Sequence, residues 1–151
     1  YRKVLQCSGK WYDYMDCVFC NIINGKISAR KIMETEKSLA FLDAFPLTKG
    51  HTLVIPKNHY AKIQEMSKDD NTDLFETVKV LTSKIEHVFS ASLVAVHNGK
   101  ESGQEVPHVH VHIIPRSADD GAGSVHTMFK KRPQLTSTEL DQIAEKLCSK
   151  N

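Results

Sequence analysis

The feature that most constrains this chain is the run His-Val-His-Val-His at positions 108–112, in which histidine alternates with valine. In a β-strand the side chains at i, i+2 and i+4 project from one face, so the three imidazoles share one side, roughly 7 Å apart. The valines and Ile113 then face the core, and a slip of one residue would bury the imidazoles instead. The run therefore predicts a strand over 108–115 whose register is fixed by its apolar face.

Imidazoles packed this closely restrict one another's charge. They cannot all be protonated cheaply, so at least one is expected to be neutral near pH 7. A neutral imidazole is a nucleophile, and its neighbours can donate protons or stabilise negative charge. The other interpretations are an accidental surface cluster, which the regular valines disfavour, and a plain metal site, because His-x-His is a common spacing of zinc ligands.

The rest of the chain predicts an α+β fold built on an antiparallel sheet. Strands are expected over 31–34, 38–43, 51–56 and 92–97, and a short helical turn over 16–25. Apolar residues at three- and four-residue spacing predict one long helix over 69–89. The capping pattern Thr136-Ser-Thr-Glu139 predicts a C-terminal helix. Its expected buried residues are Leu140, Ile143 and Leu147.

Length and composition indicate one globular domain. The chain has 151 residues, of which 40% are hydrophobic and 25% charged. A net charge of +2 gives no broad cationic surface, so no nucleic-acid partner is expected, and without an 18-residue apolar run no membrane partner is expected either. We expect one domain over 16–151 with a helical tail over about 130–151. Residues 1–15 are expected to be a disordered extension or a cloning remnant. Cysteine is too sparse for a disulfide framework, which favours the cytoplasm, with the nucleus as a second location.

Two further segments offer polar groups to a ligand. The loop Asn98–Gln104 combines small residues with amide side chains, so it is either an oxyanion-binding loop or only a connection. Asp43 ends an apolar strand, where a carboxylate can accept hydrogen bonds from both hydroxyls of a ribose. Capping of the turn before Pro46 explains Asp43 equally well.

The histidine run, followed by Ile-Ile, is accompanied by Phe41-Leu-Asp43 and by Gly50-His-Thr-Leu-Val-Ile-Pro-Lys57. Together these segments resemble the histidine triad (HIT) superfamily, in particular its Hint-type nucleotide-binding branch, over about residues 16–116. The resemblance implies a homodimer in which each subunit contributes five antiparallel strands to one continuous sheet. It also implies hydrolysis of purine nucleoside 5′-phosphoramidates, of the adenosine 5′-monophosphoramidase type, through a covalent nucleotidyl-histidine. The alternatives are a Fhit-like dinucleoside polyphosphate hydrolase and a non-catalytic nucleotide-binding interaction protein.

The same resemblance implies roles for single residues. His110 is the nucleophile, His112 contacts the phosphate and assists the leaving group, and His51 completes the cluster, with no catalytic cofactor required. Asp43 holds the ribose hydroxyls. The implied base contacts are Phe19, Ile22, Phe41 and Leu42, and the implied phosphate contacts are Asn98, Gly103 and Gln104. Glu105 departs from the pattern, because many members place Ser or Thr there. No role is assigned to His87, His97 or His126.

Cys17 and Cys20 form a Cys-x-x-Cys pair. Such a pair is a redox motif, half of a zinc site, or two small buried residues. The resemblance implies a structural zinc whose remaining ligands are His59 and the first histidine of the run, His108. In that case His108 is structural, and His110 and His112 remain for chemistry.

Overall fold

The computed structural model describes residues 4–5, 11–12 and 17–148. The chain divides into two compact units, residues 1–120 and residues 121–151. Most of the N-terminal segment for which disorder is expected lies outside the described residues. Within it, strands β1 (Val4–Leu5) and β2 (Trp11–Tyr12) pair antiparallel.

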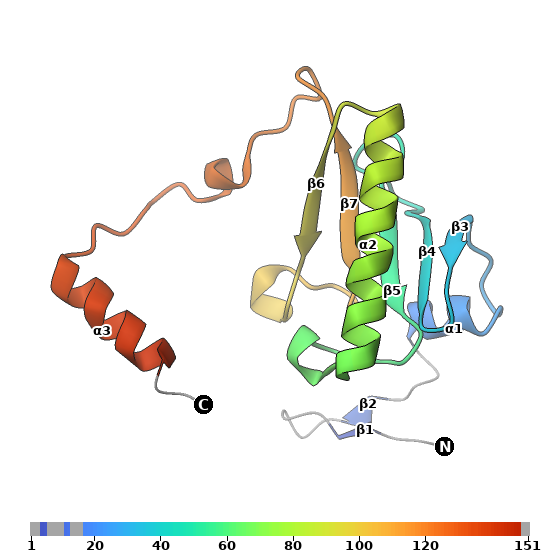
Figure 1. Cartoon of the computed structure of the whole chain (residues 1–151), viewed down its shortest axis with the longest axis horizontal. Helices are drawn as coiled ribbons and strands as arrows, with labels where there is room; N and C mark the ends of the chain where they lie inside the picture. Colours follow the sequence, from blue (N-terminus) through green and yellow to red (C-terminus); the bar gives the residue numbers. More distant parts are fainter. Residues whose placement is uncertain (1–3, 6–10, 13–16, 149–151) are drawn as a thin grey trace. The chain divides into compact units, whose positions relative to one another are not determined.

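The first unit is built on a five-stranded sheet in the order β3-β4-β5-β7-β6. Every neighbouring pair is antiparallel, which confirms the α+β fold (Figure 1). The strands are β3 (Lys31–Glu34), β4 (Ser38–Leu42), β5 (Thr52–Pro56), β6 (Ala91–Val96) and β7 (Val111–Arg116).

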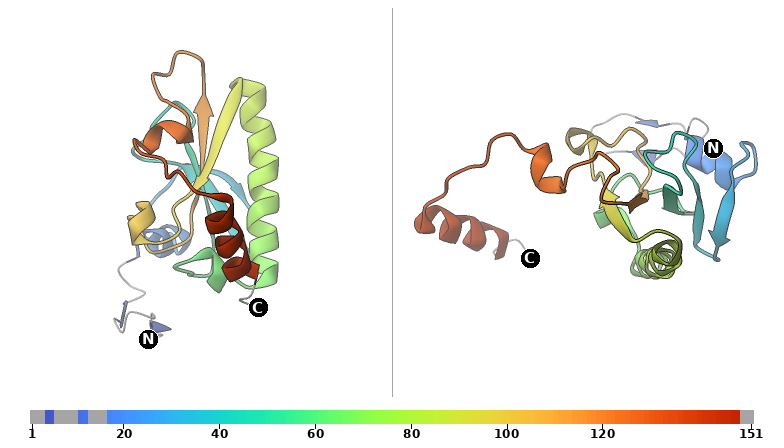
Figure 2. Two further views of the ribbon diagram at one scale, coloured as in Figure 1. Left: turned by 90° about the vertical axis from the view of Figure 1, so that its left-hand side faces the viewer. Right: turned by 90° about the horizontal axis from the view of Figure 1, so that it is seen from above.

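Helices cover both faces of this sheet (Figure 2). The long helix α2 (Lys68–Val88) begins at Ser67, whose hydroxyl accepts a hydrogen bond from the Asp70 N–H. One buried cluster joins its apolar stripe, including Leu74 and Leu81, to Val54 and Val111. A second cluster joins the short helix α1 (Val18–Ile23) to β4 and β5 on the other face. Because strand side chains alternate, odd and even positions of β5 belong to different clusters.

The histidine run differs in one respect from the expected strand, because β7 begins at Val111 rather than at residue 108. The backbone before it is bonded elsewhere: the N–H of Val109 donates to the carbonyl of Tyr60, and the N–H of His108 donates to that of Val106. The alternation nevertheless holds. The valines lie in the α2 cluster, and the imidazoles lie on the α1 face. That face is covered, so His108 and His110 are themselves buried, at 0% and 6% exposed.

Two single-turn helices, η1 (Ile63–Glu65) and η2 (Lys100–Ser102), lie in the connections on either side of α2 and β6. Gly50 turns the chain into β5 with φ +86°, and a Cβ there would lie 2.8 Å from the Phe89 ring. The absence of a side chain therefore allows both the turn and the packing of Phe89.

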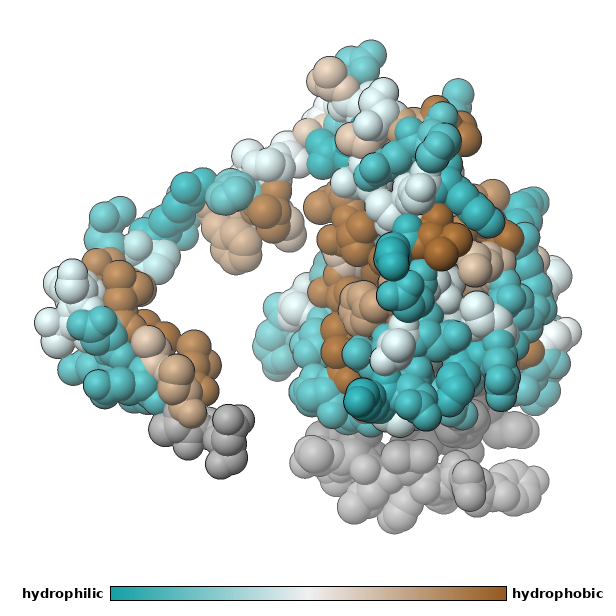
Figure 3. Space-filling model, in the orientation of Figure 1, coloured by the Kyte–Doolittle hydropathy of each residue, from teal (hydrophilic) through white to brown (hydrophobic). Residues whose placement is uncertain are grey.

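The second unit contains a single-turn helix η3 (Val125–Met128) and helix α3 (Ser137–Cys148). The expected capping box is present, since the Glu139 N–H donates to the Thr136 hydroxyl and the Thr136 N–H donates to the Glu139 carboxylate. The expected burial is wrong: Leu140, Ile143 and Leu147 are 52%, 44% and 76% exposed. Apolar residues follow one another along α3 (Figure 3), and the only other helix in the described part of this unit is the single turn η3, which is too short to cover them. Among the described residues, no helix is long and apolar enough to span a membrane.

Candidate active site and Cys/His cluster

Four histidines gather on the α1 face of the sheet, where β5, β6 and β7 lie side by side. His110 and His112 come from the histidine run, with ring centroids 5.0 Å apart. His51, just before β5, stacks on His112 at 5.2 Å, and His97, just after β6, lies 5.4 Å from the same ring. We refer to His51, His97, His110 and His112 as the imidazole cluster.

The tautomer of His110 follows from its backbone partner. Its Nδ1 lies 2.6 Å from the carbonyl oxygen of His108, which can only accept a hydrogen bond. Nδ1 therefore carries the proton in the neutral ring, and Nε2 carries the lone pair. Burial lowers the pKa of His110, and the hydrogen bond to His108 opposes that effect only in part. His110 thus presents an uncharged ring with Nε2 as its nucleophilic atom.

A second hydrogen-bonded chain fixes His112. The Leu47 N–H donates to Nδ1 of His51 at 3.2 Å, so Nε2 of His51 carries the proton and donates to Nδ1 of His112 at 3.0 Å. The proton of His112 is then on Nε2, a buried atom with no hydrogen-bond partner among the described residues. Burial, with the neighbouring imidazoles, lowers the pKa of His112 to about 4. The ring therefore offers an N–H that can donate a hydrogen bond to a phosphoryl oxygen.

Asp43 lies beside this chain, after the end of β4. Its Oδ1 accepts a hydrogen bond from the Phe45 N–H, and its Oδ2 lies 3.5 Å from Nδ1 of His51. The first contact is the turn cap that was one of the two interpretations of this residue. The second oxygen remains for a ligand, so the ribose role is compatible with the cap and stays a prediction.

Three of the four implied base contacts lie together. Phe19 and Ile22 on α1 are buried with Phe41 on β4, and the Phe19 ring packs edge-on against Phe41 and His110 at 5.9 and 5.1 Å. Leu42 is set apart: it pairs with Thr52, follows Phe41 on the same strand and is 36% exposed. Successive strand residues point to opposite faces. The side chain of Leu42 thus points away from the face on which Phe19, Ile22 and Phe41 lie, and its contact with a base stays a prediction.

The implied phosphate loop is held by its own side chains. Asn98 Oδ1 accepts from the Ile63 N–H, and its Nδ2 donates to Gln64. Gln104 Oε1 accepts from the Gly99 N–H, and its Nε2 donates to the carbonyl of Ala61.

Gly103, in the same loop, adopts φ +92° and donates its N–H to the carbonyl of Lys100. These bonds fix the loop's shape around Gly103. Direct phosphate contacts by Asn98, Gly103 and Gln104 stay predictions.

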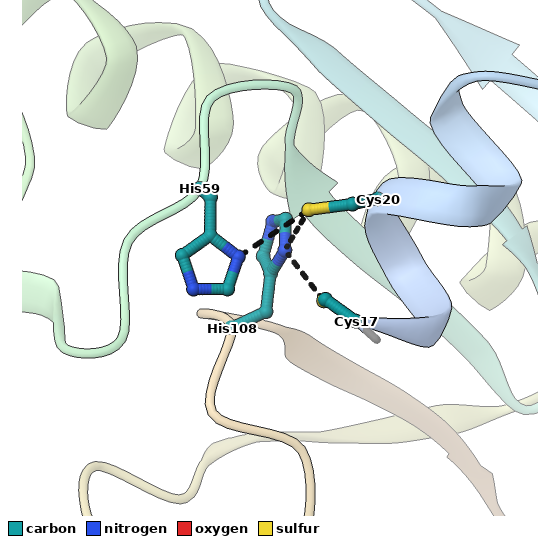
Figure 4. Close-up of side chains that lie close together, drawn as sticks. All are labelled: Cys17, Cys20, His59 and His108. Atoms are coloured by element: carbon teal, nitrogen blue, oxygen red, sulfur yellow. Dashed lines mark hydrogen bonds between the residues drawn. The ribbon is translucent and has the colours of Figure 1, made fainter. Parts of the chain in front are cut away.

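A second constellation lies next to the imidazole cluster and consists of Cys17, Cys20, His59 and His108 (Figure 4). We call it the Cys/His cluster. One potential ligand atom from each residue lies within 4.8 Å of all the others. Both thiols come from the start of α1, while His59 follows β5 and His108 precedes β7. The sequence pattern that suggested a metal site is therefore brought together in space.

The donor geometry of the Cys/His cluster fits a tetrahedral metal. Nδ1 of His108 lies 3.5 Å from the Cys17 sulfur and 3.6 Å from the Cys20 sulfur, and Nδ1 of His59 lies 3.3 Å from the Cys20 sulfur. The edges of a zinc tetrahedron with these ligands are about 3.5 Å long. His108 Nε2 donates to the carbonyl of Pro56 at 2.8 Å, which leaves Nδ1 unprotonated and facing the thiols. Burial lowers the pKa of His108 to about 4, which keeps this nitrogen available.

His97 is the residue of this site that the sequence interpretation missed. Ala95 pairs with His112 and Val96 with Val111, so the next residue reaches the strand end beside His110, on the face of Ala95. The sequence feature that could have placed it is its spacing: His97 is two residues after Ala95, so it lies on the same face of a strand that runs antiparallel to the histidine run. It could be used only once β6 was known to be the neighbour of β7.

Comparison with known proteins gives a consistent picture. Residues 24–119 match the family described as the HIT domain. The chain is 39% identical to adenosine 5′-monophosphoramidase of Schizosaccharomyces pombe over 137 residues, which are 90% of this chain and 98% of the yeast protein. It is also 39% identical to an uncharacterized HIT-like protein of Methanocaldococcus jannaschii over 132 residues, 87% of this chain and 98% of that protein.

Solved structures show the same similarity. A HIT family protein of Bacillus subtilis superimposes with a TM-score of 0.81 at 36% identity, over 90% of this chain and 97% of that one. The histidine triad nucleotide-binding protein of Candida albicans superimposes with a TM-score of 0.77 at 33% identity, over 88% and 95% of the two chains. Fold and sequence thus point to the same set of relatives.

Proposed function

The chain belongs to the HIT domain family, and from that premise we propose that it hydrolyses purine nucleoside 5′-phosphoramidates to the nucleotide and the free amine. The observation that carries this proposal is the 2.6 Å contact between Nδ1 of His110 and the carbonyl of His108, which leaves Nε2 as a lone pair in an uncharged ring. The 39% identical yeast relative is named adenosine 5′-monophosphoramidase, which supports the choice of substrate.

The reaction proceeds in two displacements at phosphorus. His110 Nε2 forms a bond to the phosphorus and the P–N bond breaks, which gives a nucleotidyl-histidine; water then attacks the phosphorus and releases the nucleotide. Splitting one slow displacement into two lowers the barrier of each. The N–H of His112 at Nε2 donates to a phosphoryl oxygen, and His51 holds the ring in that tautomer. Phe19 and Phe41 line the base side, and the free oxygen of Asp43 accepts from the ribose.

The Cys/His cluster, in this proposal, holds a structural zinc ion. Two thiolates and two imidazole nitrogens complete a closed tetrahedral set, which is typical of structural rather than catalytic sites. Bound there, zinc would tie α1 to the segment that follows β5 and to the one that precedes β7. The chemistry of the reaction is left to the imidazole cluster.

The protein acts as a homodimer in this proposal. The sheet ends at β3 and β6, and β6 is the longer of these edge strands. It also exposes Leu93 and Val94, at 36% and 42%. An unpaired edge with exposed apolar side chains favours pairing with a second chain. Light scattering coupled to size-exclusion chromatography tests this, and a monomeric mass would contradict it.

The catalytic proposal is tested by a substrate panel. Steady-state kcat/KM is measured for adenosine 5′-monophosphoramidate, for a guanosine analogue and for diadenosine polyphosphates. The proposal expects the phosphoramidates to be the better substrates and acid-labile nucleotide to be trapped on His110 during turnover. Faster cleavage of the polyphosphates would favour the Fhit-like alternative, and AMP binding without turnover would favour a binding module.

A further inference from the structure

His97 belongs to the imidazole cluster but has no part in the reaction described above. Its ring lies 5.4 Å from that of His112, and it is only half-buried. It lies close enough to His110 and His112 for its charge to oppose the protonation of both. The proposed reaction therefore leaves unexplained a half-buried imidazole that lies beside the ring of His112.

The order of the strands defines the side of the site on which His97 lies. Phe41 lies on β4 and Asp43 just after it, and His51 just precedes β5. His112 lies on β7 with His110 just before it, and His97 just follows β6, so the residues follow one another across the sheet. The nucleoside contacts of the proposed function lie at the β4 end. His97 lies at the other end, beyond the nucleophile. The amine leaving group, the substituent that the nucleoside pocket does not hold, is therefore expected on the His97 side.

The neighbouring loop leaves this imidazole accessible. Gly103 is the residue of this loop beside His97: a Cβ there would lie 4.0 Å from Nε2 of His97, and the glycine places no side chain next to this nitrogen. The loop that carries Gly103 is fixed by the two hydrogen bonds of the Gln104 side chain. The ring that packs against His97 is that of His112, and the charges of His97, Asp43 and Glu105 all act on His110.

A phosphoramidate poses a specific chemical demand on this side. An alkylamine leaves phosphorus only after its nitrogen has been protonated. His110 forms the bond to phosphorus and His51 holds His112, whose neutral ring donates its one N–H to a phosphoryl oxygen, so the help to the leaving group that the resemblance implied for His112 needs a further acid. Resting on the proposed function, we infer that His97 is the acid–base group of the reaction, donating a proton to the departing amine and then accepting one from the attacking water.

The proton balance closes over the cycle. In the first step the His110 Nε2–P bond forms, the P–N bond breaks, and the proton of the His97 imidazolium moves to the amine nitrogen. In the second step the O–P bond forms, the Nε2–P bond breaks, and neutral His97 takes the proton of the water. His97 is thereby restored, and no group outside the site is required.

Two substrates of one nucleotide separate this role from a structural one. Adenosine 5′-(butylphosphoramidate) needs a proton on its leaving nitrogen, whereas the 4-nitrophenyl ester of AMP releases a phenolate that needs none. We expect His97→Asn, which keeps hydrogen-bonding ability but cannot transfer a proton in this way, to lower kcat/KM for the phosphoramidate by about 100-fold or more. For the nitrophenyl ester we expect a change of less than about threefold. His87→Asn, on α2 and exposed, is the matched control and should alter neither.

Each other outcome has a distinct meaning. Equal losses on both substrates would overturn the acid–base role, because a misshapen site or a lost phosphate contact affects both; so would an unchanged phosphoramidate rate. His97→Gln is measured in parallel, so that a folding defect of one variant does not decide the result. A wild-type protein that cleaves the nitrophenyl ester but not the phosphoramidate would overturn the proposed function, and with it the role of His97.

Discussion

The Cys/His cluster and the imidazole cluster use the same residue type, from the same face of the same segment, for different purposes. His108 and His110 are two residues apart and both buried. The Nε2–H of His108 donates a hydrogen bond to the carbonyl of Pro56, so its Nδ1 faces the thiols. The Nδ1–H of His110 donates to the carbonyl of His108, so its Nε2 faces the imidazole cluster. The difference shows that a backbone carbonyl, by accepting a hydrogen bond from one ring nitrogen, leaves the other nitrogen unprotonated and free to act as a ligand or a nucleophile.

The largest effect is expected from a substitution in the imidazole cluster. His110→Ala removes the proposed nucleophile, Nε2, so kcat/KM for adenosine 5′-monophosphoramidate should fall by at least about 10⁴-fold, the range seen when a covalent catalyst loses its nucleophile. AMP binding, measured by calorimetry, should remain detectable because the variant leaves the proposed base and ribose contacts untouched. Turnover close to the wild-type rate would show that another residue attacks phosphorus.

The next prediction concerns the Cys/His cluster, which Cys20→Ser disrupts. The thiol lies 3.3 Å from Nδ1 of His59 and 3.6 Å from that of His108, so its loss leaves an incomplete ligand set. We expect bound zinc, measured by atomic emission, to fall from one ion per chain to a small fraction, and the free energy of unfolding to fall by about 3 kcal/mol or more. Cys148→Ser, in exposed α3, is the control and should change neither. Equal stability of wild type and Cys20→Ser would contradict a structural metal.

The neutral ring of His112 makes the stability of the folded chain depend on pH. Its pKa is about 4 in the folded chain against 6.5 in the unfolded one, so the unfolded chain binds the proton first. The stability contributed by the neutral ring is complete above pH 6.5 and is lost as the pH falls from 6.5 toward 4. The slope is at most about 1.4 kcal/mol per pH unit for one group.

His112→Asn removes this titration. Urea unfolding at pH 7 and pH 5 should show that the variant loses about 1 kcal/mol less than wild type between the two, after allowance for the solvent that reaches the ring. Metal release at low pH affects both proteins alike, so the difference isolates His112. Parallel losses in the two proteins would contradict a neutral, buried His112.

The smallest effect concerns Asp43, whose two oxygens have two roles. Asp43→Asn keeps the cap on the Phe45 N–H but replaces a carboxylate by an amide, so stability should change by less than about 0.5 kcal/mol while AMP binding weakens about fivefold. The loss should disappear for 2′,3′-dideoxy AMP, which lacks the ribose hydroxyls. Asp43→Ala should in addition lose about 1 kcal/mol of stability with the cap. Equal weakening for both nucleotides would contradict a contact between Asp43 and the ribose hydroxyls.

The sequence predicted those parts of the molecule that depend on local pattern. The two-residue alternation of the histidine run placed His110 and His112 on one face with Val111 opposite, and the helical spacing of Leu74 and Leu81 defined α2. Both periods arise from backbone geometry and are visible in the residues themselves.

What the sequence could not show depends on neighbours distant in the chain. The start of β7 was wrong because Val109 is bonded to Tyr60, which no local pattern reveals. His97 was missed because its place beside His110 follows from the order of β6 and β7. The exposure of Leu140 shows the same limit, since an amphipathic stripe says which side is apolar but not what covers it.

The carbonyl of His108 links the two clusters, because the residue whose ring faces the thiols also accepts the Nδ1–H hydrogen bond of His110, the proposed nucleophile. In the proposed function, a chelator that removed zinc from the Cys/His cluster would loosen that carbonyl and thereby slow a reaction in which the metal takes no direct part. Inhibition by chelation would then imitate the behaviour of a metalloenzyme. For this protein, the signature of a bystander ion is partial and slow inactivation that tracks loss of fold, whereas a reacting ion would give complete inactivation in a chain that stays folded.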